Sequence, residues 1–178
     1  FVLATENPVD FEGTFPLPEA QKDRFLLSCR VGYPDRTNEK KIFNSQKRVT
    51  HPVNDLKAVT DISHIVKLQQ KVVEIFIDEK IVDYILDIVE KTRISQYLSL
   101  GVSPRGALAL YRASQALAAI NGRDYVIPED VKELAISVFE KRVILKSDSL
   151  IKGLKAEEIL TEIIESTDVP VLKELKWL

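Results

Sequence analysis

The spacing of hydrophobic and polar positions changes near residue 55. Before that point short apolar runs alternate with turns, and two of these runs, FVLAT (residues 1–5) and FLLSCRV (residues 25–31), are continuously apolar. Such runs are typical of strands covered on both faces, as in parallel α/β sheets. The sequence therefore predicts two buried strands. Between them lies a loop interrupted by glycine and proline, in which Pro18 is placed to begin a short helix.

Besides the short helix at Pro18, the pattern predicts one helix before residue 55 and five after it. Asp35 is placed to cap a polar helix that runs to Gln46. Five further segments carry apolar residues at helical spacing, and Asp78 and Ser103 are placed as the N-caps of two of them. The predicted helices cover residues 61–76, residues 78–93, residues 103–121 ending at Asn121-Gly122, a segment beginning at Pro128, and residues 155–166.

These elements indicate a mainly α protein in three parts. Residues 1–34 form a remnant of an α/β layer, residues 35–60 a hinge and linking helix, and residues 61–178 a helical bundle. A sheet needs partners on its hydrogen-bonding edges and on its faces, which two strands cannot supply. The missing strands are therefore expected to precede residue 1.

Composition narrows the function classes. The chain has 178 residues, of which 45% are hydrophobic, with a net charge of −2, so we expect a folded core and no general polyanion-binding surface. The basic stretch NEKKIFNSQKR is interpreted as a solvated helix face. Cys29 is the single cysteine and lies in an apolar run, which predicts a small buried thiol and a reducing cytoplasmic setting. No apolar run approaches the roughly 18 residues that span a bilayer, so no membrane partner is expected.

Asn7 is the first candidate functional residue because it follows the first predicted strand. Ligands of open parallel sheets gather at the carboxyl ends of strands. A carboxamide there can hold a water molecule against a phosphate, since it both donates and accepts hydrogen bonds. The alternative is structural, because Asn-Pro commonly opens a turn.

Two arginines are further candidates. With Ser103 as N-cap, Arg105 falls in the first helical turn, where a cation opposes the helix dipole at a cost of about 0.3–1 kcal/mol. The same helix end attracts anions, so Arg105 is either a phosphate ligand or an extended, solvated side chain. Arg24 follows Asp23 in a loop, and a local ion pair between these neighbours is the default interpretation.

Several kinds of site are excluded or disfavoured. The segment VVEIFIDE resembles a magnesium-binding acidic strand, but Glu74 interrupts the apolar run and Asp78 is better placed as a helix cap. His51 and His64 lack metal-ligand spacing with each other and with Cys29. No glycine precedes a lysine anywhere in the chain, so it contains no phosphate-binding loop of the G-x-x-x-x-G-K-[ST] type.

Two long motifs resemble the MoxR family of AAA+ ATPases. ATENP followed by EGTFPLPEAQKDRFLL is similar to the family's sensor 1 strand and the segment that leads to its arginine finger. GVSPRGALALYRASQALAAINGRDYVIPEDV is similar to its sensor 2 helix and the next helix of the lid domain. The resemblance runs from residue 1 to about residue 172. Phe15 and Lys22 depart from the family's usual residues without changing a functional group.

The resemblance implies a role for each candidate. Asn7 would orient the attacking water, Arg24 would be the arginine finger in a neighbouring subunit's site, and Arg105 would contact nucleotide phosphates. Tyr33 and Pro34 would form the hinge from core to lid and lie near the nucleotide. The helix at 61–76 resembles an insertion that displaces the lid.

The resemblance also implies cofactors and partners. The whole protein would use ATP and magnesium in a homo-oligomeric ring, usually a hexamer. It would remodel or activate partner proteins, including proteins with von Willebrand factor A domains. The 178 residues alone, without a phosphate loop, would be inactive.

Three other functions stay open. A magnesium-chelatase-type ATPase subunit shares the same sensor layout. A helical protein-interaction module without a nucleotide role would not need the two apolar strands. A nucleic-acid-binding helical domain is disfavoured by the acidic charge balance.

Overall fold

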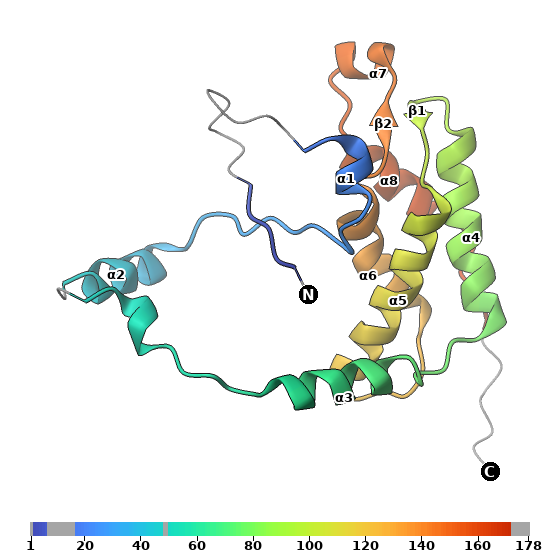
Figure 1. Cartoon of the computed structure of the whole chain (residues 1–178). Helices are drawn as coiled ribbons and strands as arrows, with labels where there is room; N and C mark the ends of the chain where they lie inside the picture. Colours follow the sequence, from blue (N-terminus) through green and yellow to red (C-terminus); the bar gives the residue numbers. More distant parts are fainter. Residues whose placement is uncertain (1, 7–16, 48–49, 172–178) are drawn as a thin grey trace.

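The computed structural model of the chain describes residues 2–6, 17–47 and 50–171 (Figure 1). This part of the chain is mainly helical and has one small antiparallel pair of strands. Its elements are α1 (Glu19–Lys22), α2 (Arg36–Ser45), the 3₁₀ helix η1 (Pro52–Asp55), α3 (Ile62–Val72), α4 (Glu79–Ile94), β1 (Leu98–Leu100), α5 (Pro104–Ile120), α6 (Pro128–Phe139), β2 (Ile144–Leu145), α7 (Ser147–Ile151) and α8 (Ala156–Glu165).

The hydrophobic core lies among α4, α5, α6 and α8, which pack side by side (Figure 1). Each helix contributes a stripe of residues three or four positions apart, as the sequence predicts. Residues at these spacings face the same side of a helix, so their burial removes a continuous apolar surface from water. The most deeply buried members include Ile81, Ile88, Leu110, Val131, Val138, Phe139 and Leu160.

Several helices begin as the sequence predicts. The carboxylate of Asp35 accepts a hydrogen bond from the Asn38 amide of α2 at 2.8 Å. The carboxylate of Asp78 accepts from the Lys80 amide of α4 at 2.9 Å. The predicted role of Asp78 as a helix cap is therefore confirmed.

The strands β1 and β2 were not predicted. They pair antiparallel, with Leu98 opposite Leu145 and Leu100 opposite Ile144. With three and two residues, they are too short to show an alternating pattern in the sequence. β1 lies between α4 and α5, and β2 follows α6, so the strand pair connects these two parts of the bundle.

The two strands predicted at 1–5 and 25–31 are wrong for the residues that the structure describes. Residues 2–6 and 25–31 have no regular secondary structure, and Leu3 and Val31 are 85% and 96% exposed. A strand forms only where a neighbouring strand satisfies its backbone groups, and no described segment pairs with these two. Cys29 is correspondingly exposed rather than buried.

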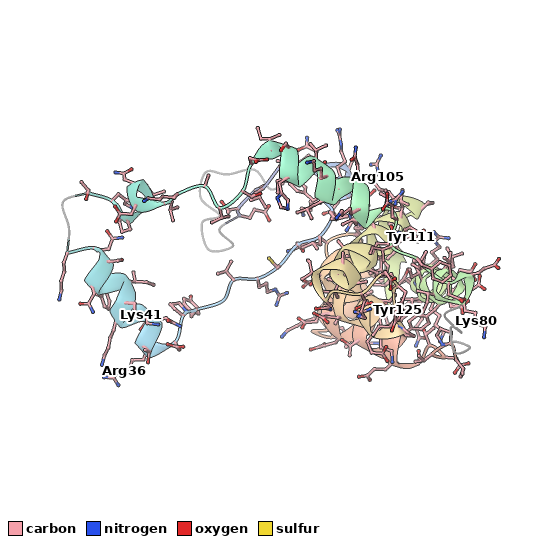
Figure 2. The ribbon with its side chains drawn as sticks, turned by 90° about the horizontal axis from the view of Figure 1, so that it is seen from below. Arg36, Lys41, Lys80, Arg105, Tyr111 and Tyr125 are labelled. Atoms are coloured by element: carbon pink, nitrogen blue, oxygen red, sulfur yellow. The ribbon has the colours of Figure 1, made fainter. Side chains whose placement is uncertain are left out.

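α2 lies apart from the bundle, and the chain returns from it through α3, which contacts α5 (Figures 1 and 2). None of the residues of α2 or α3 is buried. Arg36 and Lys41 on α2 lie far from the bundle (Figure 2). The predicted helix at 61–76 is present but shorter, and its apolar stripe stays largely exposed, with Ile62 at 83%.

The mainly helical architecture predicted from the sequence is confirmed. The boundaries at residues 34 and 60 stay a prediction. No helix among the described residues is both long and apolar enough to cross a membrane.

Candidate functional site

The start of α5 is held in place by the end of α4. The Thr92 hydroxyl, which is fully buried, accepts a hydrogen bond from the Val102 amide at 3.0 Å. The Arg93 side chain donates to the Val102 carbonyl, also at 3.0 Å. Gly101 passes so close to α4 that a Cβ atom there would lie 2.7 Å from the Arg93 backbone. These contacts fix the position from which α5 and its first-turn arginine project.

Ser103 caps α5 and also connects it to the loop after α1. Its Oγ accepts a hydrogen bond from the Gly106 amide at 3.2 Å, as expected of an N-cap. The same Oγ lies 3.2 and 3.3 Å from the two carboxylate oxygens of Asp23, to which it donates. The predicted cap is therefore confirmed, and it brings Asp23 to the N-terminal end of α5.

Arg105 faces the same carboxylate. Its Nη1 lies 3.8 Å from Asp23 Oδ2, and the Arg105 side chain is 62% exposed. An exposed pair at this distance is weak, because water screens both charges. The guanidinium therefore lies near Asp23 and remains available to another anion.

Arg142 is the most deeply buried arginine partner of Asp23. Its Nε donates to Asp23 Oδ1 at 3.1 Å, and its side chain is 4% exposed. Burial lowers the pKa of Arg142, and the neighbouring Asp23 carboxylate opposes this shift. The guanidinium stays protonated in proteins, so a buried positive charge is retained and must be compensated.

Arg24 lies directly after Asp23 but does not pair with it. Asp23 pairs with Arg142 and Arg105 instead, so the default interpretation of a local Asp23–Arg24 ion pair is wrong. Arg24 is exposed, and within the described parts of the chain its guanidinium makes no ion pair or side-chain hydrogen bond. Arg24 is thus exposed and has no ion-pair partner among the described residues, whereas the neighbouring Asp23 carboxylate is paired with Arg142 and Arg105.

Tyr33 and Pro34 are not brought to this cluster. Tyr33 is 96% exposed and Pro34 is also exposed, in the segment that leads to α2. Gly32 before them has φ +68°, a left-handed conformation that favours glycine, so the chain turns there. Asn7 lies outside the described residues.

Arg142 and Asp23 were missed by the sequence analysis as a pair. The sequence did place Arg142 three residues after the end of α6, where a cation complements the helix dipole. That signal does not identify a partner 119 positions away.

Comparisons with known proteins agree on one family. The chain is 44% identical to the uncharacterized protein YeaC of Bacillus subtilis over 96% of its own length. It is 34% identical to the chaperone MoxR1 of Mycobacterium tuberculosis over 95% of its length. The chain belongs to the MoxR family of AAA+ ATPases. It spans about half of these relatives, 53% of YeaC and 46% of MoxR1.

A solved structure and two family models extend the comparison. The crystal structure of a candidate ATPase from Cytophaga hutchinsonii superposes with a TM-score of 0.85 at 29% identity, over 93% of this chain and 53% of that one. Residues 1–27 match the model of the ATPase family associated with various cellular activities, and residues 90–163 match the AAA lid domain.

The Asp23 cluster connects these two matched regions of the MoxR-family chain. Asp23 and Arg24 belong to the ATPase-family match, whereas Arg105 and Arg142 belong to the lid match. Asp23 contacts both lid arginines. The cluster is therefore the point at which the ATPase segment is attached to the lid.

Proposed function

We propose that this chain is the sensor and lid part of a MoxR-type ATPase that couples ATP binding and hydrolysis to the remodelling or activation of partner proteins. The observation that carries the proposal is a pair of exposed arginines near Asp23. Arg24 follows Asp23 directly in the loop, and the Arg105 guanidinium lies 3.8 Å from the Asp23 carboxylate. Asp23 is already paired with buried Arg142, so the exposed Arg24 and Arg105 add positive charge at the surface, which suits a nucleotide phosphate.

In this proposal the arginines have different roles. Arg24 projects from a loop, so it can be supplied to the site of a neighbouring subunit as an arginine finger. There it stabilises the charge of the transferred phosphoryl group. Arg105 lies at the start of a lid helix and contacts nucleotide phosphates, as the sensor 2 residue. Asn7 orients the attacking water, and Tyr33-Pro34 is the hinge beside the nucleotide.

ATP and magnesium are the cofactors of the proposed reaction, which transfers the γ-phosphoryl group to water. The described residues contain no cluster of three His, Cys, Asp or Glu side chains that could hold a metal, so we assign no magnesium ligand to them. The 178 residues also lack a phosphate loop. Hydrolysis therefore belongs to a polypeptide that carries this chain together with such a loop, and the chain alone is inactive.

The proposed assembly is a homo-oligomeric ring of six subunits, because an arginine finger acts across a subunit interface. The proposed clients are proteins with von Willebrand factor A domains. The name of MoxR1, a chaperone, supports a protein-remodelling role.

The test is made in the polypeptide that carries this chain and a phosphate loop. Arg24→Ala should reduce ATP turnover by about 10³-fold or more while nucleotide affinity changes little, because a finger acts mainly in the transition state. Arg105→Ala should also slow turnover but weaken nucleotide binding more. Arg36→Ala, an exposed arginine on α2, is the matched control and should change neither.

A mixing titration tests whether Arg24 acts across an interface. Mixed with a subunit whose phosphate loop is inactivated, the Arg24→Ala subunit should regain part of its turnover, since each partner completes the other's site. Turnover near that of the wild type in Arg24→Ala alone would show that the finger lies elsewhere.

A further inference from the structure

Arg142 uses every donor that its side chain has. Besides the Nε bond to Asp23, Nη1 donates to the carbonyls of Leu26, at 3.2 Å, and of Val138. Nη2 donates to the carbonyls of Asp23, at 3.3 Å, and of Phe25. A guanidinium has five N–H donors in a fixed planar arrangement, and four of these five bonds end on residues 23–26, which we call the Arg24 loop.

The Arg142 side chain is itself fixed in the lid. Its backbone amide donates to the Phe139 carbonyl at 2.8 Å, and its guanidinium reaches the Val138 carbonyl, so the end of α6 anchors it from two sides. Its Cδ lies against the first turn of α5, where a Cβ added to Gly106 would approach it to 3.0 Å. Arg142 therefore holds the Arg24 loop against a fixed point of the bundle.

The contacts of the Arg24 loop hold the backbone on both sides of Arg24 and leave its side chain exposed. The backbone carbonyls immediately before and after Arg24, those of Asp23 and Phe25, both accept hydrogen bonds from Arg142. The Arg24 side chain stays exposed. Fixing the backbone on both sides of a side chain limits the region of space that the side chain can reach.

The chain that follows is fastened to the same helices. The Ser28 amide donates to the Ser137 carbonyl of α6 at 2.9 Å. Arg30 pairs with Glu140 at the end of α6 and, at 3.5 Å, with Glu157 of α8. Arg30 is 71% exposed, so these pairs are weak, and Arg142 is the buried element of the attachment.

We infer that Arg142 is the positioning residue of Arg24, whose loop it fixes against the helical bundle. The inference rests on the proposed function, in which Arg24 is the arginine finger. Arg142 contacts no nucleotide in this account and acts only through the Arg24 loop. A displacement of about 1 Å in a catalytic group can cost on the order of 10²-fold in rate, so the attachment has a kinetic consequence.

The test uses the polypeptide with its phosphate loop, and Arg142→Gln as the main variant. We expect kcat to fall by about 10²-fold or more while nucleotide affinity stays within about three-fold, because only the finger is misplaced. In an Arg24→Ala background the same substitution should lower kcat by less than about three-fold, since Arg142 acts through Arg24. Arg142→Lys should give an intermediate kcat, because an ammonium keeps the charge but has three donors and no planar fork.

Amide hydrogen exchange of the same proteins provides the structural measurement. In Arg142→Gln, peptides that cover residues 22–28 should exchange faster, while peptides from the interior of α4 and α6 keep their protection. This pattern indicates local release of the Arg24 loop rather than unfolding of the bundle. Unchanged exchange at residues 22–28 would overturn the inference.

The kinetic outcomes separate the inference from the proposed function. If Arg24→Ala keeps normal turnover, the finger assignment fails and the positioning role falls with it. If Arg24→Ala loses turnover but Arg142→Gln does not, or if the two losses are additive, only the positioning role fails. If Arg142→Gln does not fold, Arg142→Lys and Asp23→Asn are judged by the same criteria.

Discussion

Asp23 and Arg142 lie 119 positions apart in the sequence, and the Nε of Arg142 donates to the Asp23 carboxylate at 3.1 Å. The arginine is nearly fully buried, whereas the aspartate is 24% exposed. A buried guanidinium without a partner is costly, so this contact is one of the strongest constraints on how residues 17–31 lie on the bundle.

Asp23→Ala should therefore lower the free energy of unfolding of the 178-residue chain by about 1–3 kcal/mol, because it removes a charged partner of buried Arg142. The measurement is urea-induced unfolding followed by circular dichroism. Glu19→Ala, which breaks the exposed Lys22–Glu19 pair, is the control and should cost less than about 0.5 kcal/mol. Equal losses of stability in Asp23→Ala and Glu19→Ala would contradict the prediction that the pair with buried Arg142 contributes more than the exposed pair.

Thr92→Val should destabilise the bundle by about 1–3 kcal/mol, because it leaves the Val102 amide without its acceptor in a buried position. Valine has almost the same shape as threonine, so the loss reports hydrogen bonds rather than packing: the bond from the Val102 amide and the one that the Thr92 hydroxyl donates to the Val89 carbonyl at 2.6 Å. Thr161→Val is the matched control, since the Thr161 hydroxyl donates to the Glu157 carbonyl at the surface of α8. A neutral Thr92→Val would show that another group accepts from the Val102 amide.

Tyr84→Phe should leave the stability at pH 7 unchanged or raise it by about 1 kcal/mol. The Tyr84 side chain is 1% exposed, and its hydroxyl has no hydrogen-bond partner among the residues that the structure describes. The substitution therefore removes a buried polar atom that is left unpaired there. Tyr33→Phe, at a position 96% exposed, is the control and should have no effect.

Tyr84→Phe should also change how the stability of the protein depends on alkaline pH. Burial raises the pKa of Tyr84, and the nearby negative charge of Glu129 raises it further. The neutral phenol therefore stabilises the folded state fully below the unfolded pKa of about 10, and this stabilisation is lost as the pH rises through the folded pKa. Tyr84→Phe should lose less stability than the wild type between pH 7 and about pH 10.5, measured by urea unfolding at both values.

The purified 178-residue chain should hydrolyse no ATP, because it lacks a phosphate loop. The measurement is phosphate release with magnesium present, compared with the Arg105→Ala chain. Equal background rates in both are expected. Turnover that exceeds the Arg105→Ala rate would contradict the assignment of the chain to a sensor and lid part.

The sequence by itself determined the local features of this protein. Asp35, Asp78 and Ser103 cap their helices through amides two or three residues away, so each cap is contained in a few consecutive positions. The apolar stripes of α4, α5, α6 and α8 likewise follow from residues within one helix. The motifs that resemble the MoxR family are contiguous, and the family assignment is confirmed.

Only the tertiary structure decided which segments found partners. The runs at 1–5 and 25–31 are apolar enough for strands, yet a strand depends on a ladder of hydrogen bonds to a neighbouring strand, and their described residues form no such ladder. Leu98 and Leu145 became a strand pair because the helices around them brought two short segments together. Arg142 shows the same dependence, since four of its five acceptors lie on residues 116 or more positions away. The burial of Arg142 and its hydrogen bonds to residues 23–26 therefore follow from the packing of the chain and not from any local pattern.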